Sequence, residues 1–129
     1  MTTAFWCLLA VILIPYVLAG VGGYYRTRQF GAVDNKYPRL QAAKAEGVGA
    51  RAVAAQANAW EAVPVFASAV FVAHLAGADP GRAGSLGLAY LAARIGHAAC
   101  YLGNWDAARS MVFLVSLVLA IALFVQGAF

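Results

Sequence analysis

The sequence predicts an all-α integral membrane protein made of one domain, a bundle of four transmembrane helices. Of its 129 residues, 64% are hydrophobic and only 11% are charged, which leaves no room for a separate soluble domain. Apolar segments recur along the chain, each near the ~20 residues that an α-helix needs to cross the bilayer core. These four segments lie at about 4–25, 49–77, 83–103 and 108–127.

The first segment is followed by a polar loop at about 26–48, which sets the expected orientation. Most positive charges lie in or beside this loop, namely Arg26, Arg28, Lys36, Arg39, Lys44 and Arg51. Because cytoplasmic loops are rich in Lys and Arg, we expect the first and third loops to be cytoplasmic and both termini to lie opposite. This topology explains the net charge of +4, and it leaves no soluble basic surface for nucleic acid.

The second segment contains the most informative run, RAVAAQANAWEAVPVF at 51–66. Helical spacing places Arg51, Asn58 and Glu61 on one face. An ionisable side chain at membrane depth costs on the order of 3 kcal/mol or more, and it points to a functional site by default. We therefore expect these three side chains to point into a single cleft.

The third segment carries a second polar stripe, because Arg94, His97 and Tyr101 are spaced i, i+3, i+7. Counted from the cytoplasmic ends at ~1.5 Å per residue, Glu61 and Arg94 both lie very roughly 15 Å deep. A pairing of Glu61 with Arg94 would neutralise both charges, and the purely structural alternative is that the pair does nothing more.

Cations outnumber carboxylates on the cytoplasmic side, where Arg26 ends the first segment and Arg109 with Ser110 begins the fourth. The arginine fork suits carboxylates, so this excess predicts an anionic ligand. On its own, an Arg-Ser pair at a helix start is typical of a snorkelling anchor. Cys7 and Cys100 have no metal-ligand neighbours at a recognised spacing, so we expect them to be packing residues and expect no metal site.

These residues, in this order and spacing, resemble the membrane-associated proteins in eicosanoid and glutathione metabolism, the MAPEG family. The resemblance covers most of the chain, and the block from Arg51 to Phe66 is its strongest part. It continues through ARIGHAACYLGN at 93–104, Arg109-Ser110, and DNKYPR at 34–39, which looks like the loop of bacterial members.

The resemblance implies a four-helix subunit that forms a homotrimer in a bacterial inner membrane. Glutathione would bind between subunits near the cytoplasmic side, and a lipophilic substrate would arrive from the membrane lipids. The two carboxylates and one ammonium of glutathione complement a cleft rich in Arg with one Glu. The residues implied to hold it are Arg26, Asn58, Glu61, Arg94, His97 and Tyr101, with Arg51 in the same cleft.

The implied chemistry depends on Arg109, which would stabilise the glutathione thiolate, and on Ser110, which would donate a hydrogen bond to the sulfur. The favoured function is a glutathione-dependent transferase or peroxidase acting on lipophilic electrophiles. A noncatalytic trimer that binds lipids or assembles a complex is the alternative. Ala54 and Phe113 favour this alternative, because some family members have Arg at the position of Ala54 and Tyr at the position of Phe113. A third hypothesis is a proton-coupled exporter that uses Glu61 as its proton-binding residue. The arginines that accompany Glu61 argue against this hypothesis.

Overall fold

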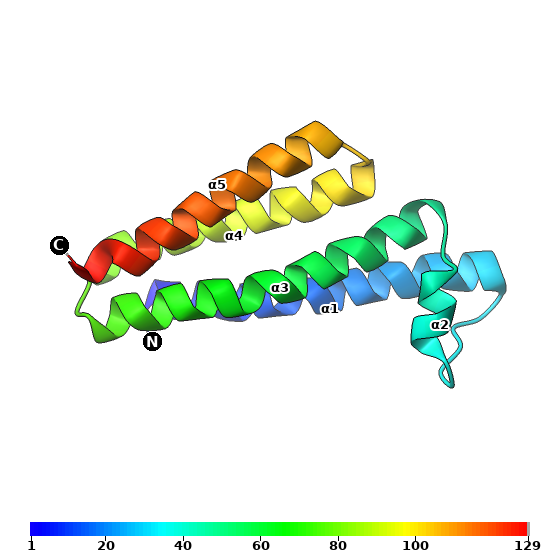
Figure 1. The fold of residues 1–129 in the computed structure, drawn as a ribbon. Helices are drawn as coiled ribbons and strands as arrows, with labels where there is room; N and C mark the ends of the chain where they lie inside the picture. Colours follow the sequence, from blue (N-terminus) through cyan, green and yellow to red (C-terminus); the bar gives the residue numbers. More distant parts are fainter. Residues whose placement is uncertain (129) are drawn as a thin grey trace.

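The computed structural model describes residues 1–128 and consists of two antiparallel pairs of long helices (Figure 1). Helix α1 spans Thr3–Phe30 and packs along α3, Gly47–Leu75, with the short helix α2, Pro38–Ala43, between them in sequence. Helices α4, Pro80–Gly103, and α5, Asp106–Val125, form the second pair. A 3-10 turn, η1, covers Gln126–Ala128.

All four predicted segments are helical, and the largest difference lies at the end of the first. Helix α1 continues past residue 25 and stops where Gly31 adopts φ 85°, a left-handed conformation that glycine tolerates without steric cost. The predicted loop at 26–48 is therefore shorter, and it contains α2. That helix has Pro38 in its first turn, where the missing N–H would have no partner anyway.

Within residues 1–128, three helices are long and apolar enough to cross a membrane: α1, α3 and the α5 segment through Ala128. The predicted third span, α4, is not among them, because it contains several glycines together with Arg82, Arg94 and His97. Its 24 residues nevertheless exceed the ~20 needed for a crossing, and it packs against the other three long helices. Four spans therefore remain a proposal.

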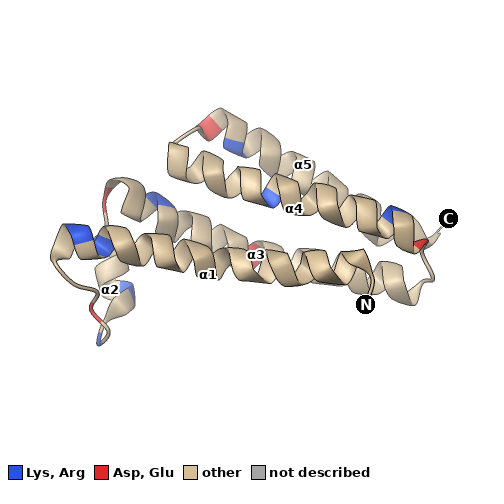
Figure 2. Ribbon diagram, turned by 180° about the vertical axis from the view of Figure 1, so that it is seen from behind, with Lys and Arg blue, Asp and Glu red and all other residues tan. Residues whose placement is uncertain are grey.

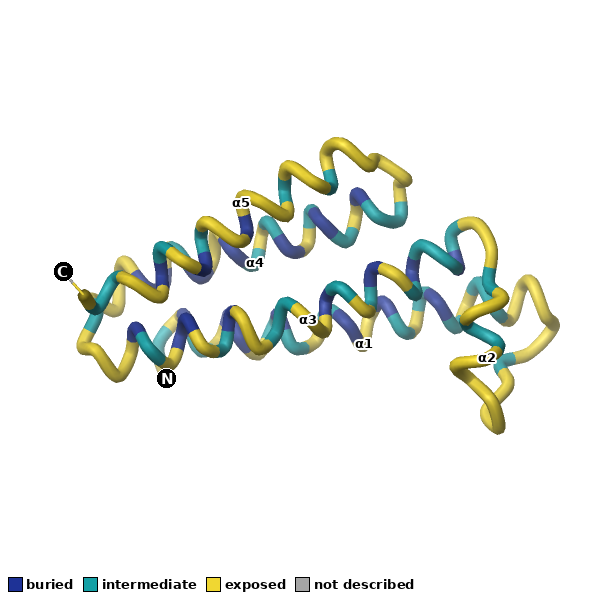
Figure 3. The backbone as a smooth tube through the Cα atoms, in the orientation of Figure 1, coloured by how far each residue is buried: buried dark blue, intermediate teal, exposed yellow. Residues whose placement is uncertain are grey.

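Large apolar side chains cover much of the outside of the bundle, where Figure 3 shows long exposed stretches. Side chains on α1, α3 and α5 are at least half exposed, including Trp6, Leu13, Val17, Phe71, Leu114 and Val118. An apolar surface of this extent is unusual for a soluble monomer. It suits lipid or contact with another protein.

Lys and Arg gather at one end of the bundle, which carries α2 and the α4–α5 turn (Figure 2). We call this the α2 end. The main hydrophobic core lies toward the opposite end, where Val11, Phe66, Tyr90 and Leu123 from the four long helices are buried together. The helix pairs diverge toward the α2 end (Figure 1). The polar residues predicted from the sequence therefore lie on the α2 side of this core.

Candidate functional site between α3, α4 and α5

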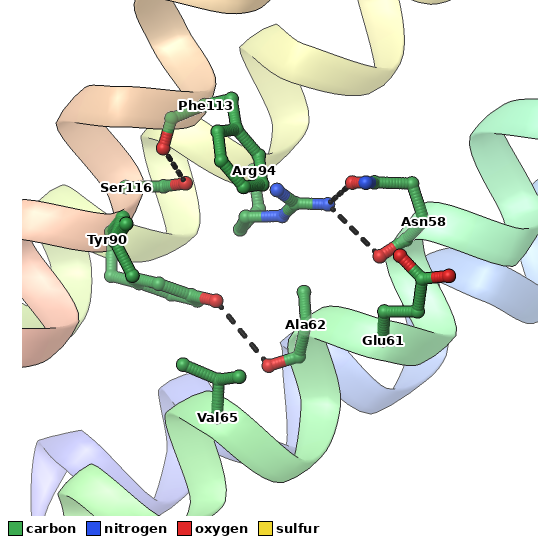
Figure 4. A pocket seen from close by; sticks show the side chains of 9 residues that line it. Asn58, Glu61, Ala62, Val65, Tyr90, Arg94, Phe113 and Ser116 are labelled. Carbon is green, nitrogen blue, oxygen red and sulfur yellow. Dashed lines mark hydrogen bonds between the residues drawn. The ribbon is translucent and has the colours of Figure 1, made fainter.

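A cavity of about 150 Å³ lies between α3, α4 and α5 (Figure 4). We call it the central pocket. Its polar side is formed by side chains from two helices, α3 and α4, and its apolar side includes residues of α5. The lining residues are Asn58, Glu61, Ala62, Val65, Tyr90, Arg94, Phe113, Ser116 and Leu117.

Arg94 is the buried cation of the central pocket, and it is only 4% exposed. Its Nη2 donates to Asn58 Oδ1 at 2.6 Å and to the Asn58 carbonyl oxygen at 3.4 Å. The expected Glu61–Arg94 pair is therefore replaced by a bond between Arg94 and a neutral amide. Figure 4 shows the Glu61 carboxylate on the Asn58 side of the pocket. Thus the pocket carries a guanidinium and a carboxylate that do not share a hydrogen bond.

A second group of site residues adjoins the central pocket through Phe113, which lines it. The His97 ring is 3% exposed. It packs edge-on against Tyr101, with centroids 5.2 Å apart, and lies 6.1 Å from the Phe113 ring. The Arg109 guanidinium carbon lies 4.5 Å from the Tyr101 ring centroid. The structure thus brings together three residues predicted from sequence, His97, Tyr101 and Arg109.

Ser110 is exposed in the first turns of α5, next to Arg109. Its Oγ donates to the Asp106 carbonyl oxygen at 3.1 Å, a bond within its own helix. Serine in a helix commonly makes this bond. The hydroxyl would have to rotate before it could donate to a ligand.

Arg51 and Arg26 do not line the central pocket. Arg51 Nε donates to the Leu102 carbonyl oxygen at 3.1 Å, which joins the start of α3 to the end of α4. Arg26 donates to Gly22 and Pro38 carbonyl oxygens and lines a separate cavity of about 390 Å³ beside α2. The single cleft expected from helical spacing is thus divided within one chain, because residues that share a helical face can still lie at different positions along the helix.

Sequence reasoning missed two polar residues of the central pocket, Tyr90 and Ser116. The Tyr90 hydroxyl donates to the Ala62 carbonyl oxygen at 3.3 Å, and Ser116 Oγ donates to the Phe113 carbonyl oxygen at 2.7 Å. A signal for both was present. Tyr90 precedes Arg94 by one helical turn, and Ser116 follows Arg109 by two turns, so each extends a stripe that had already been identified.

Together, the fold and the site define an α-helical membrane protein whose charged and aromatic residues converge between three helices. The MAPEG family model matches residues 3–129, nearly the whole chain. The protein belongs to the MAPEG family, which confirms the resemblance seen in its sequence. Comparisons with curated proteins and with solved structures gave no match. Membership of the family is consistent with a glutathione-related or membrane function.

Proposed function

We propose that this protein is a glutathione-dependent transferase or peroxidase that acts on lipophilic electrophiles. The strongest support comes from Arg94 and Glu61, the two charged side chains of the central pocket, which do not share a hydrogen bond. Arg94 is bonded to Asn58, so its positive charge is not neutralised by a hydrogen-bonded Glu61. A guanidinium and a carboxylate held in this way complement a carboxylate and an ammonium. Glutathione carries both groups.

The size of the central pocket supports a site that is completed by another copy of the chain. Its volume of about 150 Å³ is below the roughly 300 Å³ at which ordinary ligand pockets begin. Glu61 and its neighbour Trp60 are exposed in the single chain. We therefore propose a homotrimer with glutathione between subunits. Arg26 does not line the central pocket of its own chain. In the proposed trimer it would belong to the glutathione site of a neighbouring subunit.

Arg109 supplies the charge that the proposed chemistry needs. Glutathione contributes a thiol, and its thiolate form is the nucleophile. A free thiol titrates near ~8.5, and a nearby guanidinium favours the thiolate. Arg109 is half-buried at the α2 end and lies over a ring face. Its charge is thus available to an anion, and Ser110 beside it offers a hydroxyl.

The apolar lining of the central pocket supports a lipophilic second substrate. Val65 on α3 and Phe113 and Leu117 on α5 line the cavity and are exposed, so part of the lining lies on the outer side of the single chain. A substrate dissolved in the bilayer would reach this side without crossing water. By the distribution of Lys and Arg, we place the α2 end in the cytoplasm, and we place the protein in a bacterial inner membrane.

A noncatalytic lipid-binding protein is the second candidate. A groove of about 390 Å³ between α1 and α4 favours it, because its lining is almost entirely apolar and includes Leu13, Val17, Ile95 and Leu102. Phe113 also brings no hydroxyl to the central pocket. A proton-coupled exporter is not favoured, since Arg94 shares the pocket with Glu61 and would repel a cationic substrate.

Titration of the purified protein with glutathione tests this proposal. We expect saturable heat of binding together with the ultraviolet absorbance of a thiolate at neutral pH. S-methylglutathione, which has no thiol, should bind without that absorbance. Binding without any thiolate would favour the noncatalytic candidate. The absence of saturable binding for both compounds would contradict a glutathione site altogether.

A further inference from the structure

The tight turn between α4 and α5 brings the last turn of one helix against the first turn of the next. Helix α4 ends at Gly103, and Asn104 adopts φ 60°, which asparagine tolerates better than most residues. The Trp105 N–H donates to the Cys100 carbonyl oxygen at 2.9 Å, and the Arg109 N–H donates to that of Trp105 at 2.9 Å. The chain therefore reverses within two residues.

This reversal places two pairs of residues face to face across the helix hairpin. His97 and Tyr101 are one turn apart on α4, and Arg109 and Phe113 are one turn apart on α5. The Arg109 guanidinium lies 4.5 Å from the Tyr101 ring centroid, well inside the ~6 Å limit for a cation–π contact. The buried His97 ring packs against the same tyrosine. The tyrosine ring is thus held between a histidine and an arginine.

Without such a contact, an arginine in the first turn of a membrane helix extends toward the phosphates of the lipid headgroups. The Tyr101 ring offers Arg109 a competing partner on the protein side. The ring is half-buried, and partial desolvation strengthens a cation–π contact relative to an exposed one. The contact therefore opposes movement of the guanidinium toward lipid.

We propose that Tyr101 is a positioning residue, whose ring holds the Arg109 guanidinium at the edge of the site while His97 fixes the ring. This inference rests on the proposed function, in which Arg109 stabilises the thiolate. It gives Tyr101 a role that depends on its ring and not on its hydroxyl. It also gives the buried His97 a role that requires no contact with ligand.

Two substitutions of Tyr101 separate the ring from the hydroxyl. Tyr101→Phe keeps the ring, and we expect thiolate absorbance to keep its wild-type dependence on pH. Tyr101→Leu removes the ring, and we expect the thiolate fraction at neutral pH to fall about 2- to 30-fold, the range that corresponds to one cation–π contact. The thiolate fraction is compared at saturating glutathione in each variant, so that a change in affinity does not enter the comparison. The control is Tyr24→Leu on α1, which removes a ring that lies 5.9 Å from the Arg28 guanidinium carbon and a hydroxyl that accepts from Arg28.

A readout without ligand keeps this test independent of catalysis. The Nε–H nuclear magnetic resonance signal of Arg109, assigned by its loss in Arg109→Ala, should shift in Tyr101→Leu and stay in place in Tyr101→Phe. Unchanged thiolate and an unchanged Arg109 signal in Tyr101→Leu would overturn the inference, as would equal loss of thiolate in both variants. If the wild type forms no thiolate, the proposed function fails, and the Arg109 signal alone then decides whether the Tyr101 ring holds the guanidinium.

Discussion

At the scale of single residues, Arg94 is a charged side chain that is held in place by burial and hydrogen bonding. It is almost fully buried, and its side-chain partner is Asn58, a neutral amide. A hydrogen bond to a charged group contributes about 1.5–3 kcal/mol to stability. Asn58 therefore has a structural role in addition to lining the central pocket. That role can be measured without any ligand.

Replacing Asn58 with alanine should destabilise the fold. We expect Asn58→Ala to lower the free energy of unfolding by about 1.5–3 kcal/mol, because the Arg94 guanidinium loses its side-chain acceptor. Unfolding in detergent micelles with increasing denaturant provides the measurement. Asn35→Ala, in the exposed loop before α2, is the matched control and should change little. Equal stability of the two variants would show that this hydrogen bond does not stabilise the bundle.

Glu61 should affect the binding of glutathione more than the fold. We expect Glu61→Gln to weaken glutathione binding about 10- to 100-fold, the equivalent of one charge-assisted hydrogen bond. Isothermal titration calorimetry at neutral pH measures the change. Glu46→Gln is the control, because Glu46 is exposed before α3 and its side chain makes no capping bond. An unchanged dissociation constant for Glu61→Gln would remove Glu61 from the proposed site.

At the scale of elements, the length of the apolar segments predicts the four long helices well, but helical spacing does not predict which residues of other helices lie opposite them. Arg51, Asn58 and Glu61 share a helical face, yet Arg51 bonds to the end of α4 while the other two line the central pocket. Helix α4 contacts this face of α3 at two separate places, with Leu102 bonded to Arg51 and Arg94 bonded to Asn58. Helix α2 has only six residues, too few for a periodic pattern to reveal.

Close packing of α4 on α1 depends on a glycine. A Cβ atom at Gly87 would lie 3.4 Å from Ala4 Cα and 3.5 Å from Cys7 Cβ, which leaves no room for a longer side chain. We expect Gly87→Leu to destabilise the bundle by about 1–3 kcal/mol through overpacking. Denaturant unfolding measures this loss. Gly20→Leu on α1, where nothing lies within 4 Å, should be tolerated, and equal losses would argue against close α1–α4 packing.

At the scale of the whole molecule, the bundle combines its main hydrophobic core toward one end with a positively charged α2 end. The exposed apolar faces and the small central pocket both support assembly with further copies. The sequence indicated which charged and polar side chains lie within the bundle, because charges at membrane depth are rare. It did not indicate that Arg94 prefers Asn58 over Glu61, since depth along a helix does not determine side-chain direction.

The proposed homotrimer has a direct test in the mass of the solubilised protein. We expect native mass spectrometry from mild detergent to give three times the 13.5 kDa of the single chain. Light scattering with correction for bound detergent should agree. A monomer or dimer that still binds glutathione would contradict a site shared between three subunits.

The proposed chemistry requires that Arg109 stabilises the glutathione thiolate, and a comparison of three proteins tests this requirement. Wild type, Arg109→Ala and the control Arg82→Ala, an exposed arginine at the other end of the bundle, are each saturated with glutathione, and thiolate absorbance is recorded at neutral pH. We expect absorbance from wild type and Arg82→Ala, and none from Arg109→Ala although glutathione still binds. Equal absorbance in wild type and Arg109→Ala would contradict the proposed chemistry.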